Sequence, residues 1–281
     1  VGELQRLTQD AGPDFHPALS SDGSRMVFVS NRSGSEEIWI KDLRTGQDSA
    51  LTASRSNKYL PLLSPDGSKV GFSSSQNENW SIYVVPTTGG APEMICEDCG
   101  ALNTWLSDGK RGLYNSLHGR VHLLDLSSSR QTELLDRPGQ YLCDAYLSPD
   151  DRWITFLAVT GGSSRVYIAP FQVEGPIGQS AWIAVTDGKS WEFNPVWSPD
   201  GKLIYFFSDR DGFRCIWARR FDPFMKRPVS APFPILHSHG SRRSLMRLDV
   251  GQQTASLAHD KIVFSMGERT GNIWMAEWKE Q

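Results

Sequence analysis

The sequence lacks the features that mark a membrane-spanning or nucleic-acid-binding protein. None of its apolar runs approaches the ~18 residues that a membrane-spanning helix needs, and no segment repeats apolar residues at the 3.6-residue period of an amphipathic helix. The net charge is −3 and there is no basic run, whereas phosphate binding needs clustered Lys and Arg. Cysteine is scarce, with four residues in 281. We therefore expect a helix-poor domain that neither inserts into a membrane nor binds nucleic acid.

What the sequence does contain is a repeat. Six times a short apolar run ends in a turn of the Ser-Pro-Asp-Gly type, and an apolar-aromatic pair follows. The turn Asp and the ring residue lie 17, 17, 14, 17, 17 and 14 residues apart, at Asp22 and Trp39, Asp66 and Tyr83, Asp108 and His122, Asp150 and Tyr167, Asp200 and Trp217, and Asp260 and Trp274. Short β-rich units at a period of 42 to 60 residues are typical of propellers.

We predict an all-β fold: a six-bladed β-propeller of four-stranded blades, forming a single domain over residues 1–281. The blades are expected at about 13–52, 57–95, 100–135, 140–186, 191–236 and 242–278. Only seven residues follow Trp274, so the sixth blade would lack its outer strand, while residues 4–8 have an outer-strand sequence. We expect this N-terminal strand to close the last blade, because an open sheet edge is a liability. The Asp residues of the turns are expected to bond their own turns rather than a metal.

Three segments carry a resemblance to a known family. Ser64–Phe72, Trp197–Phe206 and Phe28–Gly34 followed by Ile38-Trp39 resemble the repeats of TolB-like six-bladed propellers. The resemblance implies fold rather than function, since such propellers occur in periplasmic binding proteins, in the gating domains of prolyl-oligopeptidase-type peptidases and as sensor modules of bacterial regulators. Arg242–Leu245 and Thr270–Met275 are similar to the C-terminal end of soil-bacterial signalling proteins, in which a propeller follows a Ser/Thr kinase or winged-helix domain.

Two short motifs contain the residue types that bind metals. Cys96 and Cys99 form a single Cys-x-x-Cys pair, for which free thiols, a local disulfide and a metal site stay open, in that order of preference. A disulfide would indicate an oxidising compartment. His237 and His239 lie on one face of an extended segment, but a metal would also need a carboxylate or a further His from elsewhere. Structural hydrogen bonding of these two is favoured, and no cofactor is expected.

Loops on one face of the ring are predicted to form a binding rim. Loops between second and third strands and between blades emerge on one face, and the Asp-Gly turns on the other. Aromatic, Arg and His side chains, which anchor binding surfaces, gather on the first face at His16, Tyr59, Trp80, Tyr141, Trp191, Glu192, Arg210, His237, His239, Arg242 and Arg243. The insertion 221–247 is expected to shape the channel mouth, with Arg242 and Arg243 holding an anionic group.

Sequence signatures of an enzyme are missing. There is no Gly-x-Ser-x-Gly nucleophile elbow and no phosphate loop. We expect a monomeric, non-enzymatic propeller that binds a protein or small-molecule ligand at its loop face, as the sensor or interaction module of a larger bacterial signalling protein. Alternatives are a free periplasmic TolB-like binding protein and a propeller-type polysaccharide lyase or peptidase-associated propeller. An extracytoplasmic location is favoured, and a kinase domain elsewhere in the parent protein stays open.

Overall fold

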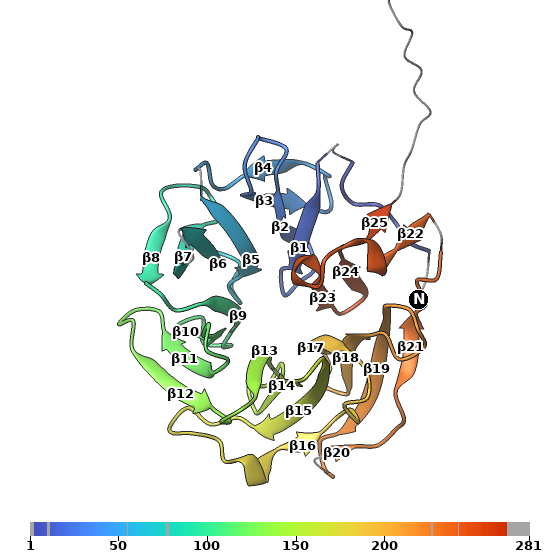
Figure 1. The fold of residues 1–281 in the computed structure, drawn as a ribbon. Helices are drawn as coiled ribbons and strands as arrows, with labels where there is room; N and C mark the ends of the chain where they lie inside the picture. The colour runs from blue at the N-terminus through green and yellow to red at the C-terminus, as the bar shows by residue number, and fades with distance from the viewer. Residues whose placement is uncertain are drawn as a thin grey trace, which may run out of the picture.

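The chain forms a ring of antiparallel sheets around a central axis (Figure 1). The structure, a computed structural model, describes residues 3–9, 12–54, 56–76, 79–225, 227–240 and 242–268. In each blade the strands follow one another in chain order from the axis to the outer edge. Among the described residues no helix has the length and apolar content needed to cross a membrane.

Five blades account for most of the chain. The first consists of β1 (Asp14–Leu19), β2 (Arg25–Ser30), β3 (Glu37–Asp42) and β4 (Asp48–Ala50), and the second of β5 (Asn57–Leu63), β6 (Lys69–Gln76), β7 (Asn79–Pro86) and β8 (Glu93–Cys96). The third consists of β9 (Ala101–Trp105), β10 (Arg111–Asn115), β11 (Val121–Asp125) and β12 (Gln131–Leu135), and the fourth of β13 (Tyr141–Leu147), β14 (Trp153–Thr160), β15 (Ser163–Pro170) and β16 (Ile183–Ala184). The fifth has β17 (Glu192–Trp197), β18 (Leu203–Ser208) and β19 (Cys215–Asp222), with β20 (Arg227–Pro228) and β21 (Phe233–Leu236) sharing its outer position.

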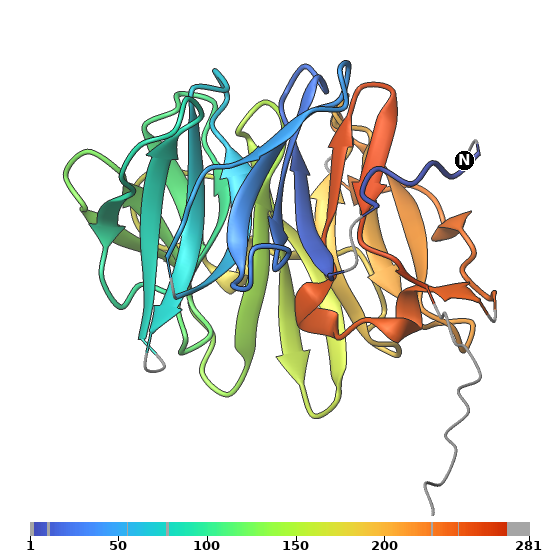
Figure 2. The same ribbon diagram turned by 90° about the horizontal axis from the view of Figure 1, so that it is seen from above.

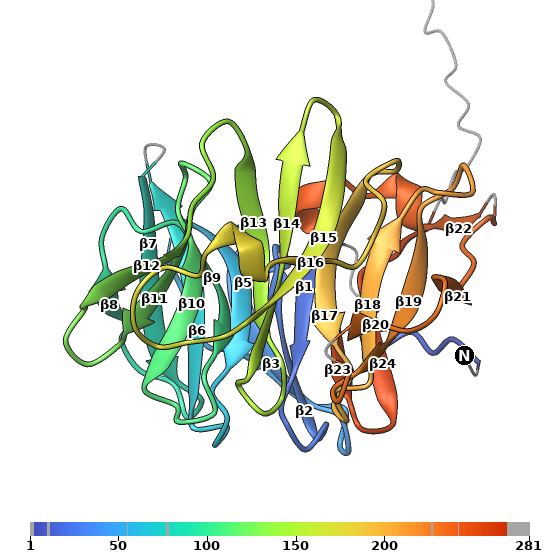
Figure 3. The same ribbon diagram turned by 90° about the horizontal axis from the view of Figure 1, so that it is seen from below.

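The repeated turns join the first and second strands of the blades and are held by their own Asp. In the second blade Asp66 Oδ1 accepts hydrogen bonds from Ser64 Oγ at 2.6 Å and Ser68 N at 3.0 Å, and Gly67 takes a φ of 67°, which glycine adopts without strain. The hydrogen bond from the Ser64 hydroxyl contributes most to lowering the pKa of Asp66 to about 2. We call the face that carries these turns the turn face. The opposite face, where the β14–β15 hairpin projects (Figure 3), is the loop face.

In the five blades the ring residue of the repeat lies opposite a second aromatic side chain on the second strand. Tyr83 stacks on Phe72 at 5.6 Å between ring centroids, and Tyr167 stacks on Phe156 at 5.8 Å. Phe72 and Phe156 are almost completely buried. Burial of such rings is a large hydrophobic contribution, and their pairing adds to it. The fixed spacing from turn to ring therefore reflects the register between the second and third strands.

The prediction of six four-stranded blades is wrong, because the structure is a five-bladed propeller with four-stranded blades. The sixth repeat forms two separate two-stranded ladders in the described residues: β23 (Ala255–Ala258) with β24 (Lys261–Phe264), and β22 (Arg243–Ser244) with β25 (Gly267–Glu268). The 3-10 turns η2 (Leu245–Arg247), which follows β22 directly, and η3 (Val250–Gln252) separate β22 from β23. The turn motif at Asp260 thus specifies a hairpin but no blade, and Trp274 lies outside the described residues.

The expected closing strand over residues 4–8 is also absent, since residues 3–9 contain no strand. This N-terminal segment still runs beside the red C-terminal segment of the ring (Figure 2). Leu7 packs against a core cluster that joins Met26 and Phe28 of the first blade to Val263 of β24, and Arg6 forms an ion pair with Glu268. The segment therefore joins the two ends of the ring through side chains rather than through a β-ladder.

Candidate functional site

Inner strands of four blades bend at a bulge about halfway along the central channel. His16, Leu60, Asp144 and Asn194 have φ between 51° and 53°, and the strand register shifts at each of these places. A positive φ is unfavourable for residues other than glycine, so surrounding contacts must hold it. Here those contacts come from the neighbouring blades.

His16 connects three parts of the ring. Its Nδ1 accepts a hydrogen bond from Leu60 N of the second blade at 3.3 Å, and its Nε2 bonds Gly251 O. Because a carbonyl only accepts, Nε2 must carry the proton and Nδ1 must be free of one. Desolvation by burial lowers the pKa of His16 to about 4, which keeps the ring neutral at physiological pH.

Asp144 and Asn194 repeat this contact on the other side of the ring. Asp144 Oδ2 accepts a hydrogen bond from Asn194 N at 2.8 Å, and Asn194 Oδ1 accepts one from Ala255 N at 2.8 Å. Burial raises the pKa of Asp144, and the Asn194 N–H opposes this effect. Neither residue was singled out from the sequence. One available signal was proline five residues before the turn Asp, at 17, 61 and 195, since proline interrupts a β-ladder.

The channel contains a cavity of about 490 Å³ between these bulges and the turn face. Its walls come from the inner strands of all five blades and from residues 254–258. Apolar and hydroxyl side chains dominate, and the lining includes Trp105, Trp197, Pro65, Pro149 and Pro199. Among the described residues that line it, Asp151 carries the single carboxylate. An apolar concave site with few polar groups is typical of ligand-binding pockets.

Of the predicted rim residues, His16 lines this cavity. His16 is 3% exposed, so it belongs to the channel wall rather than to an exposed rim. Tyr59 lies 6.3 Å from the His16 ring and stacks on Trp80 at 4.7 Å. These three rings form a continuous row from the channel to the loop face. The structure thus brings part of the predicted set together.

Glu192 and Arg210 form a buried ion pair inside the fifth blade. The Arg210 guanidinium also lies 5.1 Å from the Trp217 ring. Arg32 occupies the same repeat position in the first blade, 3.5 Å from Asp14 and 4.5 Å from the Trp39 ring. Burial raises the pKa of Glu192, while Arg210 opposes this. The ion pair and the ring beside its Arg occur in both blades, so they belong to the repeat. Sequence composition alone does not indicate this structural role.

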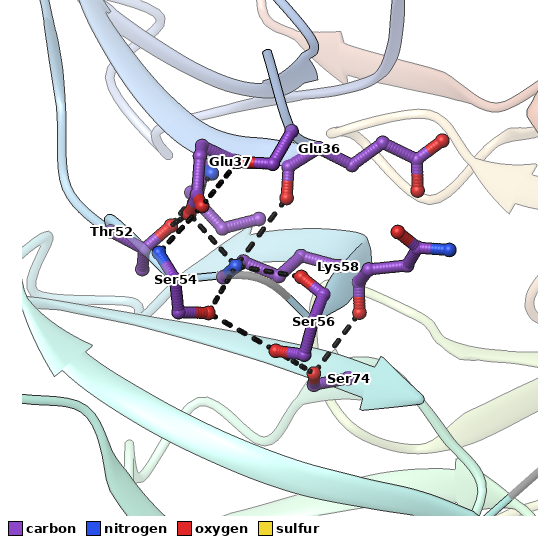
Figure 4. A network of polar contacts seen from close by, with 10 residues as sticks. Glu36, Glu37, Thr52, Ser54, Ser56, Lys58 and Ser74 are labelled. Atoms are coloured by element: carbon purple, nitrogen blue, oxygen red, sulfur yellow. Dashed lines mark hydrogen bonds and ion pairs between the residues drawn. The ribbon is translucent and has the colours of Figure 1, made fainter. Parts of the chain in front are cut away.

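Lys58 is the centre of a buried polar network at the loop-face end of the first two blades (Figure 4). Its side chain is 3% exposed, and Nζ lies 2.8 Å from Glu37 Oε2 and 2.9 Å from Ser54 Oγ. Burial opposes ionisation of Glu37, but hydrogen bonds from Lys58, Thr52 and Ser54 N outweigh it and lower the Glu37 pKa. A second pocket of about 450 Å³ adjoins the network, lined by Ser54, Ser56, Asn57, Ser75 and Gln76.

The remaining predicted residues lie apart from the channel cavity. Tyr141 is 44% exposed, and Trp191 N donates to Asp209 Oδ1 at 2.9 Å. Arg242 and Arg243 both pair with Glu268, at 2.9 and 3.3 Å. Their charge is thus partly matched within the protein. The role of these residues in binding stays a prediction.

The two metal-type motifs differ in their structural setting. Cys96 and Cys99 form a disulfide, with Cα atoms 5.9 Å apart. His237 and His239 meet Asp211 and Cys215, and the four ligand atoms all lie within 4.8 Å of one another. Sequence reasoning called for a carboxylate partner to these imidazoles but did not find Asp211, because the 221–247 insertion hides the pairing of β21 with β19.

Comparisons with known proteins agree with this architecture. Residues 2–119 match the family model described as the TolB beta propeller domain. The structure of a candidate TolB from Agrobacterium tumefaciens superposes with a TM-score of 0.65, covering 76% of this chain and 79% of that one at 20% identity. Residues 2–119 are thus similar to TolB β-propeller domains. At this identity the structural likeness shows the fold alone.

Curated relatives match parts of the chain. An uncharacterized protein of Agrobacterium fabrum strain C58 is 30% identical over 138 residues, 47% of this chain and 45% of that protein. A protein named TolB homolog from Chlorobium luteolum is 47% identical over 47 residues, 16% of this chain and 11% of that protein. The chain therefore spans less than half the length of the curated relatives that it matches.

Proposed function

We propose that this TolB-like propeller is a non-enzymatic binding module that takes a segment of a protein partner into its central channel. The observation that carries the proposal is the cavity of about 490 Å³ enclosed by all five blades. Its apolar walls and scattered hydroxyls suit an uncharged, partly apolar segment. A rigid ring also keeps such a site open without a partner, which lowers the cost of ordering it on binding.

The titratable groups of the cavity support binding rather than catalysis. His16 is held in one tautomer, with both ring nitrogens bonded. Asp151 Oδ2 accepts hydrogen bonds from Ser107 N at 2.8 Å and Ser107 Oγ at 2.6 Å. Acid–base catalysis needs a group that can reach and exchange a substrate proton. Both candidates are instead engaged with the protein itself.

We further propose an extracytoplasmic location, either as the sensor or interaction module of a larger bacterial signalling protein or as a free TolB-like protein. The Cys96–Cys99 disulfide supports the location, because disulfides persist in oxidising compartments. The relative named TolB homolog favours the free form, and the likeness of the last third to signalling proteins favours the module. Trapping the thiols of the native protein with an alkylating agent in intact cells tests the location.

Photocrosslinking tests whether the channel binds a partner. A photoreactive benzoylphenylalanine at Thr104, which lines the cavity, is expected to give a discrete adduct with one partner chain in cells. The same group at Thr88, which is exposed on the β7–β8 connection, serves as the matched control. Thr254→Arg places a long cation in the cavity from the opposite wall and is expected to abolish the adduct, whereas Thr88→Arg leaves it unchanged.

Two outcomes would refute channel binding. Equal labelling from positions 104 and 88 would mean that contact is not specific to the cavity. An adduct at position 104 that survives Thr254→Arg in a folded protein would mean that the partner does not enter. Circular dichroism and the melting temperature of each variant establish that it is folded.

A further inference from the structure

We propose that Asp211, Cys215, His237 and His239 bind one Zn²⁺ ion at the loop-face end of the fifth blade. Asp211 lies in the loop between β18 and β19, and Cys215 is the first residue of β19. His237 and His239 follow β21, which pairs with β19 through Ile216 and Leu236. The ladder therefore brings together ligands that are 22 to 28 residues apart in the chain.

Five of the six distances between the ligand atoms are close to those of a tetrahedral ion, and the sixth, from Cys215 Sγ to His239 Nε2, is at most 4.8 Å. Asp211 Oδ2 lies 3.2 Å from His237 Nδ1 and 3.1 Å from His239 Nε2, and these two nitrogens are 3.3 Å apart. Ligands at the Zn–N and Zn–O distances of roughly 2.0–2.1 Å stand about 3.3–3.4 Å apart around a tetrahedron. Cys215 Sγ lies 3.8 Å from His237 Nδ1 and 3.9 Å from Asp211 Oδ2, near the roughly 3.6 Å that the longer Zn–S bond gives.

Three of the four ligand atoms are equally close to one another. Polar atoms of Asp211, His237 and His239 form a triangle with every edge between 3.1 and 3.3 Å. When both imidazole nitrogens carry protons, both N–H groups can donate to the same Asp211 oxygen. When neither carries one, three lone pairs point toward a common centre, and a metal ion there would accept all of them at once.

The donor set selects the class of ion. One thiolate and two imidazoles are ligands of zinc rather than of the oxygen-preferring Ca²⁺ and Mg²⁺. With Cys215 and Asp211 ionised the site and its ion are neutral together, which suits a thiol that is completely buried. Ser238 N lies 3.3 Å from Cys215 Sγ, and the Phe213 ring stacks on His239 at 4.3 Å. Outer contacts of this kind orient metal ligands.

The first blade already holds a cation at the same repeat position. Glu37 faces Ser30 across β2 and β3 as Cys215 faces Ser208 across β18 and β19. In the first blade Glu37 and Ser54 bind the Lys58 ammonium group, and Thr52 donates a hydrogen bond to Glu37 (Figure 4). In the fifth blade His237 and His239 take the corresponding places after the outer strand. The fold thus offers a cation position that one blade fills with a side chain and the other with a metal.

Four protein ligands leave no open coordination position, so the proposed role is structural. The ion would fasten the end of the 221–247 insertion to the fifth blade, where the chain passes toward β22. It would do so whether or not the channel binds a partner. The proposal is therefore independent of the proposed function.

Metal analysis of the full chain, purified without a metal-affinity column, tests the proposal. After the protein is loaded with zinc by dialysis and free zinc is washed away with buffer, we expect one bound zinc per chain. The variants Cys215→Ser and His239→Gln should retain none. The matched controls Cys143→Ser and His259→Gln change the same residue types away from the site and should retain it. Zinc should raise the melting temperature of the chelator-treated wild type and leave that of Cys215→Ser unchanged.

X-ray absorption at the zinc edge examines the wild type directly, so the test survives a variant that fails to fold. One sulfur at about 2.3 Å and three nitrogen or oxygen ligands at about 2.0–2.1 Å are expected. Wild-type protein that retains no zinc would overturn the proposal. So would zinc that persists in Cys215→Ser, or a coordination shell without sulfur.

Discussion

Acid is expected to destabilise this propeller through one buried side chain, His16. The ring is 3% exposed, and its Nδ1 accepts a hydrogen bond from Leu60 N. Protonation would place a charge in the channel wall and turn that acceptor into a donor facing another donor. Folding therefore favours the neutral ring, and burial lowers the His16 pKa from 6.5 to about 4.

The size and sign of the effect follow from the two pKa values. Above pH 6.5 the ring is neutral in both states and has no effect on the free energy of unfolding. Between pH 6.5 and 4 the unfolded chain binds a proton that the folded chain does not, so stability falls as the pH falls. At 1.36 kcal/mol per pH unit the full loss is ~3 kcal/mol, with about 2 kcal/mol lost by pH 5.

Urea unfolding at pH 7.5 and pH 5 measures this loss. His16→Asn is the informative variant, because Asn194 occupies the corresponding bulge in the fifth blade with a φ of 51°. The variant should be less stable at pH 7.5, since it loses the bond to Gly251, but the decline toward pH 5 should shrink by about 2 kcal/mol. His259→Gln, an exposed histidine, should decline like the wild type. An undiminished decline in His16→Asn would refute the reasoning.

Three further predictions concern stability. Asp200→Ala should lower the free energy of unfolding by ~1 kcal/mol, because its turn loses hydrogen-bond acceptors. Channel crosslinking should stay intact, and its loss at unchanged stability would contradict this prediction. Lys58→Met should lower the free energy of unfolding in urea by about 3–5 kcal/mol, because the Glu37 carboxylate is left buried without its cation. Adding Glu37→Gln should recover part of that loss, and no recovery would argue against the pairing. Reducing the Cys96–Cys99 disulfide should cost at most ~2 kcal/mol, because the loop that it closes is short, and a larger drop in melting temperature would show a wider role.

The repeat predicted the blades well wherever all its parts recur. In the second blade the turn at Asp66, the ring at Tyr83 and the strands between them were all marked in the sequence, and β5 to β8 follow them closely. Among the described residues the sixth repeat keeps the turn at Asp260 but forms only the β23–β24 hairpin and the short β22–β25 pair. A turn motif fixes a local hairpin, whereas a blade also needs its third and outer strands to pair over some length. Turn spacing does not report that pairing.

The candidate site was less predictable because residue type does not distinguish a surface from an interior. Arg210 and Glu192 were assigned to the rim as charged loop residues, yet they pair inside the blade, with Glu192 completely buried. The recurrence of Ser-Asn-Arg at 30–32 and Ser-Asp-Arg at 208–210 was the available signal of a repeated structural contact. The channel cavity lies toward the turn face because the bulges at His16 and Asn194 divide the channel. Strand bulges depend on contacts between blades that the sequence pattern does not show.

In a propeller, side chains that recur from blade to blade serve the shared packing, whereas side chains that occur in one blade serve something particular to that blade. The Asp turns and the facing aromatic rings recur because the blades share one packing problem, and the Arg over its aromatic partner recurs in the first and fifth blades. Cys215 stands where the first blade has Glu37, and its neighbours His237 and His239 stand where that blade has hydroxyl side chains, one bonded to Glu37 and one to Lys58. The proposed cation position thus recurs in the repeat, buried at Lys58 in the first blade and more exposed at His237 and His239 in the fifth, where its ligands differ. A blade that changes the residues at a position whose structural role is known from another blade is a good candidate for a special function. In this ring the fifth blade is such a case.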